Sequence, residues 1–151
     1  MIESSRETLY RFCEKFIESR YARINSNIDS LQEALTAETK SSAGDKHETG
    51  RAMIQLEREK LGHQLAEVQL LQELFKKIPI KTGSSKVGLG SVVYTDMQNY
   101  YMGVSAGELK IDGVSYFTIA PNTPIGKLLL GKVVCDVVVF NTRKIIILKI
   151  K

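Results

Sequence analysis

The decisive stretch of this 151-residue chain is Thr39-Lys40-Ser41-Ser42-Ala43-Gly44-Asp45, a run of small and polar residues. On each side lies an amphipathic segment of roughly 30 residues, whose apolar side chains recur at helical spacing along one stripe. The first stripe contains Ile17, Tyr21, Ile24, Ile28, Leu31 and Leu35, and the second contains Ile54, Leu61, Leu65, Val68 and Phe75. Because the break is short and the segments are similar in length, we predict an antiparallel hairpin of two helices, over residues 5–40 and 45–77.

The second half of the chain has a different composition. All three prolines and eight of the 11 glycines lie after residue 78. Runs rich in β-branched and aromatic residues predict a small, mostly antiparallel sheet; they cover Ser91–Thr95, Tyr100–Val104, Val114–Ala120, Val133–Phe140 and Lys144–Ile150. One short helix is predicted over Thr123–Gly131, because Thr123 suits an N-cap, Pro124 the first helical position and Gly131 the C-terminal end.

The expected fold class is therefore α+β. It consists of an N-terminal antiparallel coiled-coil helical hairpin followed by a small, mostly antiparallel β domain with one short helix. Residues 1–80 are assigned to the hairpin, with its tip at about 39–48. Residues 81–86 have the composition of a linker, and residues 87–151 form the C-terminal domain.

Composition excludes several classes of protein. No apolar run approaches the roughly 20 residues of a membrane span, and the first residues do not form a signal peptide, so we expect a cytoplasmic protein. The two cysteines, Cys13 and Cys135, are expected to be reduced thiols. With only His47 and His63 to join them, a zinc site or a Cys–His nucleophile pair is not expected.

The net charge of +4 is distributed unevenly. Residues 1–80 carry 12 Lys/Arg against 13 Asp/Glu, whereas residues 81–151 carry 9 against 4. A basic second half fits an anionic partner surface, and it fits ordinary solubilising charge equally well.

The hairpin tip carries two carboxylates, on Asp45 and Glu48, three positions apart. This spacing resembles a capping box at the start of the second helix, where carboxylates are also favoured by the helix dipole. It also fits a pair of oxygen ligands for a hard cation such as Mg²⁺, presented at the end of a long, thin rod. Capping and metal binding are compatible, and the spacing alone leaves both open.

Two motifs resemble those of one known family. Gly44-Asp45-Lys46-His47-Glu48 resembles the Gly-Asp-x-x-Glu hairpin tip of the bacterial Gre transcript-cleavage factors. The segment Thr123-Pro-Ile-Gly-Lys-Leu-Leu-Leu-Gly-Lys132, followed by Asp136, is similar to the Ser-Pro-Ile/Leu-Gly-(Arg/Lys)-Ala-Leu-Ile/Leu-Gly-Lys segment of that family and its downstream Gly-Asp. The two motifs occur in the family's order and span nearly the whole chain.

The resemblance implies a function. Gre factors have an FKBP-like C-terminal domain that docks at the rim of the RNA polymerase secondary channel, while the hairpin reaches the active site. By resemblance, Asp45 and Glu48 would help to hold a second Mg²⁺ shared with the polymerase, which then cleaves the nascent RNA 3′ end of backtracked complexes. The protein would be a monomeric cofactor of another enzyme's active site and not itself an enzyme.

The same resemblance suggests which residues meet each partner. Docking to the polymerase would involve the short-helix segment, namely Pro124, Ile125, Gly126, Lys127, Gly131 and Lys132. RNA phosphates could be bound by Lys40, Lys46 and Arg51 near the tip, although a solvated charged face explains these three as well.

Some residues depart from the family pattern. Lys46 and His47 replace the usual Leu-Ser, Thr49 follows Glu48 in place of Asn, and Cys135 replaces the glycine before Asp136. These changes keep open a regulator that occupies the channel without stimulating cleavage. A prolyl isomerase and a dimerising coiled-coil adaptor are weaker alternatives, because aromatic residues are scattered and the break at residues 39–45 favours pairing within one chain.

Overall fold

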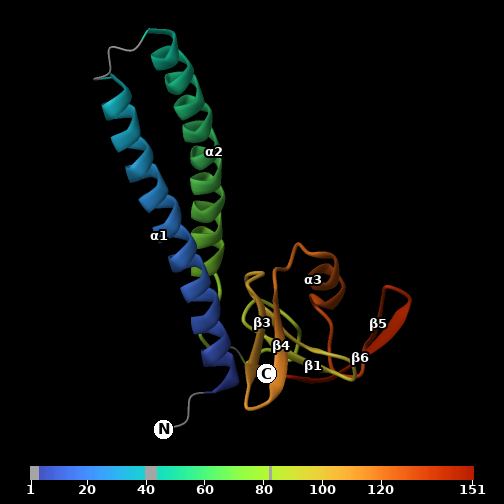
Figure 1. Cartoon of the computed structure of the whole chain (residues 1–151). Helices are drawn as coiled ribbons and strands as arrows, with labels where there is room; N and C mark the ends of the chain where they lie inside the picture. Colours follow the sequence, from blue (N-terminus) through green and yellow to red (C-terminus); the bar gives the residue numbers. More distant parts are fainter. Residues whose placement is uncertain (1–3, 40–43, 82) are drawn as a thin grey trace. The chain divides into compact units, whose positions relative to one another are not determined.

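The computed structural model describes residues 4–39, 44–81 and 83–151, with the backbone alone for residues 38, 39 and 44–48. Two long helices begin the chain, α1 over Ser5–Thr39 and α2 over Gly44–Lys76, and they run antiparallel as a hairpin (Figure 1). Both helices agree with the predicted ranges to within one residue at each end. The predicted helical hairpin is therefore confirmed.

The chain divides into two compact units. One, which we call the hairpin unit, is Ile17–Gln72, and the other, the sheet unit, comprises Met1–Phe16 and Glu73–Lys151. The sheet unit therefore includes the first turns of α1 and the end of α2. The division into residues 1–80, 81–86 and 87–151, expected from composition, stays a prediction.

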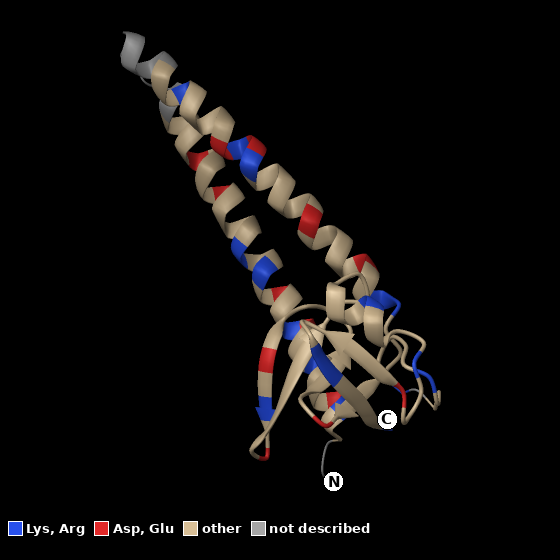
Figure 2. Cartoon of the chain, turned by 90° about the vertical axis from the view of Figure 1, so that its right-hand side faces the viewer, with Lys and Arg blue, Asp and Glu red and all other residues tan. Residues whose placement is uncertain are grey.

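The hairpin unit is held together by the two apolar stripes. Ile17, Ile24, Leu61 and Val68 are buried, and the other stripe residues of this unit are half-buried. Acidic and basic residues both occur along the two helices (Figure 2). One pair, Arg20 and Glu67, lies 4.0 Å apart across the helices with both side chains exposed. Because solvent screens such a pair, packing of the stripes and not ion pairing stabilises this unit.

The sheet unit contains six strands and one short helix. The strands are β1 (Val92–Thr95), β2 (Asn99–Met102), β3 (Gly107–Ile111), β4 (Val114–Ile119), β5 (Val137–Phe140) and β6 (Arg143–Ile150), and the helix is α3 (Pro124–Leu129). The sheet order is β3-β4-β2-β1-β6-β5. Every neighbouring pair is antiparallel except β2 and β4, which are parallel. The predicted α+β fold with a mostly antiparallel sheet is confirmed.

One face of the sheet forms the main core with α3. Alternating strand residues supply one side of this core and Ile125 and Leu129 of α3 the other. The buried strand residues are Val93, Tyr100, Met102, Ile119, Val138, Ile145 and Ile147. Within the sheet unit, α3 is therefore held against the sheet by apolar contacts.

The opposite face packs against the first turns of α1. Leu9 and Cys13 of α1 and Tyr101 of β2 are fully buried. The Cys13 thiol donates a long hydrogen bond of 3.6 Å to the Val104 carbonyl, and burial raises the pKa of this thiol to about 11. The Tyr101 hydroxyl has no hydrogen-bond partner among the described residues. Tyr100 and Tyr101 thus pack on opposite faces of one strand, as expected of sheet residues.

Two tyrosines on this face should make the fold sensitive to alkali. Burial raises the pKa of Tyr94 to about 12 and also raises the pKa of Tyr101, whereas an unfolded tyrosine has a pKa of about 10. The pKa of each tyrosine is higher in the folded protein than in the unfolded chain, so the folded state holds these protons more tightly. The resulting contribution to stability is fully present below about pH 10 and is lost as pH rises through the folded-state pKa values. We expect the free energy of unfolding to fall above pH 10 by up to about 1.4 kcal/mol per pH unit for each of the two.

Urea unfolding between pH 8 and 11 measures this loss. Tyr101→Phe keeps the ring and removes the unpartnered hydroxyl, so the variant should lose less stability per pH unit than the wild type. An unchanged pH slope in Tyr101→Phe would show that this tyrosine is not the group that titrates on unfolding.

The structure differs from the sequence prediction at two strands. β3 was not predicted, because Gly107-Glu-Leu-Lys-Ile111 is a half-polar edge strand with a weak hydrophobic signal. The predicted strand Val133–Phe140 begins only at Val137. Its first residues form a tight turn, in which the Asp136 carboxylate accepts a hydrogen bond of 2.8 Å from the Val133 N–H.

Candidate functional site

The hairpin tip lies at the beginning of α2. Asp45, Lys46 and Glu48 fall within the first five residues of this helix, for which the structure describes the backbone. Positions three apart along a helix share one face, so Asp45 and Glu48 belong to the same side of its first turns. Arg51 is exposed on α2, and Lys40 lies outside the described residues.

Two carboxylates suit magnesium but do not complete a site for it. Mg²⁺ prefers six oxygen ligands in octahedral geometry, and a pair of side chains can supply only part of that set. Among the described side chains, no three His, Cys, Asp or Glu residues gather into a metal site. A cation bound by two carboxylates alone would need its remaining ligands from another molecule or from water.

The second candidate site is α3 and the turn before it. Thr123 is the N-cap, and its hydroxyl accepts a hydrogen bond of 3.1 Å from the Gly126 N–H and donates one of 2.7 Å to the Ala120 carbonyl. Pro124 occupies the first helical position, as predicted. Thr123 therefore caps α3, a role for which threonine and serine are both suited.

The six residues of this segment predicted to dock differ in exposure. Ile125 and Gly126 are buried, Lys132 is half-buried, and Pro124, Lys127 and Gly131 are exposed. A Cβ at Gly126 would lie 2.1 Å from the Ala120 carbonyl oxygen, which explains why glycine is needed there. Ile125 and Gly126 therefore hold α3 in place, and the exposed residues form the surface that a partner could contact.

The turn after α3 explains another part of the motif. Cys135 has a backbone φ of 77°, in the left-handed region that glycine adopts most easily. Its N–H donates a hydrogen bond of 2.8 Å to the Ile147 carbonyl, and the Asp136 carbonyl accepts one of 3.0 Å from the Ile147 N–H. The backbone here therefore favours the glycine that the Gre pattern has at this position.

Cys135→Gly is expected to stabilise the protein by about 1 kcal/mol, because glycine has no steric cost at positive φ. Cys135→Ala is the matched control, since it removes the sulfur and keeps the Cβ that is strained. Chemical denaturation of both variants measures the difference. If the glycine variant is no more stable than the alanine variant, the backbone at residue 135 is not strained.

One group of residues was not singled out from the sequence. Met97, Gln98, Tyr100, Phe140, Asn141, Arg143 and Ile145 line a pocket of about 330 Å³ in the sheet unit. They come from two segments about 40 residues apart, brought together by the sheet order. In the sequence, only the turn residues Asn141 and Thr142 between two apolar runs hinted at a hairpin here.

Comparison with known proteins finds two matching chains among the solved structures. No family model and no curated protein sequence matches the chain. One solved structure, described as the "Structure of the transcription factor Gfh1", is 20% identical, and the match covers 93% of this chain and 92% of that chain with a TM-score of 0.36. No helix among the described residues is long and apolar enough to cross a membrane. With so low a TM-score, the match establishes neither the family nor the function.

Proposed function

We propose that this protein is a regulator of RNA polymerase whose hairpin enters the secondary channel and stimulates cleavage of backtracked RNA. The observation that carries the proposal is the position of Gly44-Asp45-Lys46-His47-Glu48 at the start of the second helix of a long hairpin. Helices of 35 and 33 residues extend about 50 Å at 1.5 Å per residue, long enough to reach deep into a channel.

In this proposal Asp45 and Glu48 supply oxygen ligands to a Mg²⁺ held jointly with the polymerase. A bound Mg²⁺ stabilises negative charge on the attacking and leaving oxygens of a phosphodiester. The free protein should bind Mg²⁺ only weakly, because two carboxylates are too few for a complete site. Lys46 and Arg51, with Lys40, would attract the phosphates of the extruded RNA 3′ end.

Docking is assigned to the exposed surface of α3 and the residues after it. Pro124 and Lys127 are exposed on a helix fixed by the Thr123 cap and by buried Ile125. A rigid, preorganised surface loses less conformational entropy on binding than a mobile one. The excess of Lys and Arg in residues 81–151 would favour an acidic partner surface.

A second candidate function is a channel regulator that does not stimulate cleavage. It is favoured by Lys46, His47 and Thr49, which depart from the family pattern on both sides of Glu48. In this form the hairpin would compete with other factors for the channel and leave the RNA intact.

The test is an RNA-cleavage assay on stalled elongation complexes from the same organism, with and without the purified protein. The proposal predicts faster shortening of the RNA from its 3′ end, with short RNA fragments released. Binding to the complexes without cleavage would establish the second candidate function. Absence of both binding and cleavage would reject both.

A further inference from the structure

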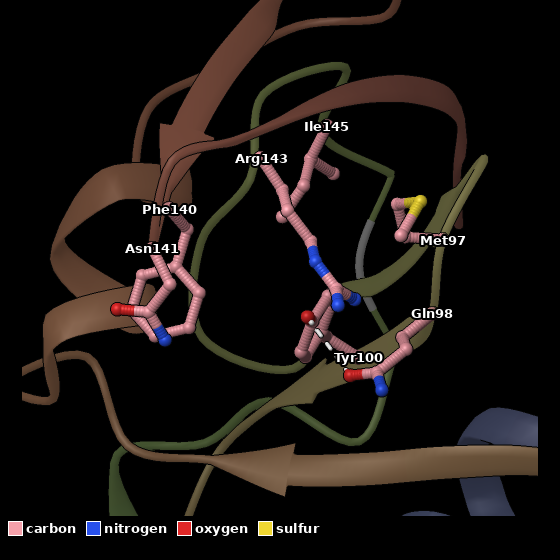
Figure 3. Close-up of a pocket in the computed structure, with 7 residues that line it drawn as sticks. All are labelled: Met97, Gln98, Tyr100, Phe140, Asn141, Arg143 and Ile145. Carbon is pink, nitrogen blue, oxygen red and sulfur yellow. Dashed lines mark hydrogen bonds between the residues drawn. The ribbon is translucent and has the colours of Figure 1, made fainter.

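The pocket of about 330 Å³ lies in the sheet unit, and its described lining residues do not include those of α3. Its walls come from the β1–β2 turn, the start of β2, and the hairpin between β5 and β6 (Figure 3). Tyr100 and Ile145 are buried, and Met97 is 48% exposed at the opening. Gln98, Asn141 and Arg143 are also exposed, so the pocket is an open depression in which Tyr100 and Ile145 are the buried lining residues.

Hydrogen bonds fix the turn that forms one wall. The Thr95 hydroxyl accepts hydrogen bonds from the backbone N–H groups of Met97 and Gln98, at 3.1 and 2.9 Å, and it donates to the Gln98 carbonyl. The Tyr100 hydroxyl donates a hydrogen bond of 3.2 Å to the Gln98 side-chain oxygen. The Gln98 amide group is thereby held in place, with its NH₂ still able to donate.

The facing wall is the β5–β6 hairpin. Asn141 and Thr142 have φ values of 50° and 67°, so both turn residues are left-handed, as in the tight turns that join antiparallel strands. This turn places Phe140 opposite Arg143 in the register of the two strands. Figure 3 shows the Arg143 side chain extending across the pocket toward Tyr100 and Gln98.

The polar groups of the pocket are mainly donors, and its charge is positive. Arg143 is the one lining residue charged at neutral pH, and it has no ion pair with any described residue. The neighbouring acidic residue, Asp96, is not one of the lining residues. Its carboxylate instead accepts a hydrogen bond of 2.8 Å from the Ile146 N–H. Arg143 is exposed to solvent, and a ligand that replaces water at its guanidinium would bring acceptors and negative charge.

We propose that this pocket binds a small free carboxylate with an apolar or aromatic body. The carboxylate would pair with the Arg143 guanidinium, whose fork geometry matches two carboxylate oxygens. The body would lie against Phe140 and Tyr100. A phosphate group carries up to two charges and fits less well, because one arginine is the single cation of the lining.

The test uses the full chain and three probes: 3-phenylpropanoate, its neutral amide and phenyl phosphate. In a titration followed by amide NMR signals, 3-phenylpropanoate should bind with a dissociation constant of about 1 mM and shift the signals of Gln98, Asn141 and Ile145. The neutral amide and phenyl phosphate should each bind at least about tenfold more weakly. Equal binding of the amide, or tighter binding of phenyl phosphate, would overturn the proposal.

Variants identify the residue responsible. Arg143→Met should weaken 3-phenylpropanoate binding at least about tenfold, whereas Lys144→Met, which removes the same charge from the next residue outside the pocket, should leave it unchanged. Asn141→Asp, which adds a negative charge to the lining, should weaken binding comparably without altering Arg143. The proposal is wrong if Arg143→Met and Asn141→Asp both bind 3-phenylpropanoate as tightly as the wild type. It is also wrong if Lys144→Met weakens this binding as much as Arg143→Met does.

Discussion

Replacing Asp45 with Asn or Glu48 with Gln should abolish the stimulation of RNA cleavage while leaving the fold intact. Each substitution keeps the size and most of the hydrogen-bonding capacity of the side chain and removes the negative charge that a Mg²⁺ ligand needs. Asp45 and Glu48 lie at the start of α2, where loss of a negative charge removes only its interaction with the helix dipole, so stability should change by less than about 1 kcal/mol. The loss of stimulation should be partly reversed by raising the Mg²⁺ concentration.

Three measurements separate a metal role from a capping role. Cleavage rates on backtracked complexes report the metal role, thermal unfolding reports the cap, and binding to the polymerase serves as the control for docking. Glu57→Gln is the matched control, since it removes one negative charge from an exposed position of α2 outside the tip. If both carboxylate variants stimulate cleavage as well as the wild type, the metal assignment is wrong.

The second large effect is expected at Gly126. A side-chain carbon there would lie 2.1 Å from the Ala120 carbonyl oxygen and 2.8 Å from the Thr123 hydroxyl oxygen. The Ala120 oxygen belongs to the backbone, so the added carbon can be accommodated only by moving the turn or α3. We expect Gly126→Ala to lower the free energy of unfolding by about 3 kcal/mol, at the upper end of the usual cost of overpacking.

Gly88→Ala is the control in the same unit, because no atom lies within 4 Å of the added carbon and the backbone φ is not positive. Chemical denaturation should show a large loss for Gly126→Ala and little change for Gly88→Ala. Because α3 carries the proposed docking surface, Gly126→Ala should also weaken polymerase binding. A Gly126→Ala protein as stable as the wild type would mean that α3 does not pack on the Ala120–Thr123 turn as described.

The sequence predicted the hairpin well because its evidence is local and repeated. The apolar stripes from Ile17 to Leu35 and from Ile54 to Phe75 have helical spacing, and the polar break between them placed both helix ends within one residue. The α3 N-cap was predictable for the same reason, since Thr123 and Pro124 are adjacent and each has a specific role at a helix start.

The parts that were missed depend on contacts between distant residues. The run from Val133 to Phe140 is apolar except for Asp136, and its hydrophobic pattern does not reveal that Cys135 adopts a positive φ and delays the strand to Val137. The pocket around Arg143 forms because β6 pairs with β1 beside the β1–β2 turn. No sequence pattern encodes that juxtaposition, because strand order is set by the packing of the whole sheet.

The most direct test of the central claim is a cross-link from the hairpin tip to the polymerase. A single reactive thiol can be placed there with His47→Cys in a Cys135→Gly background, because Cys13 is buried and its pKa is raised to about 11. With a short thiol-linked photo-cross-linker, the account predicts attachment to polymerase segments beside the active-site metal, and protection when another channel-binding factor is added first. A protein that binds the polymerase but cross-links only to its outer surface would contradict the account.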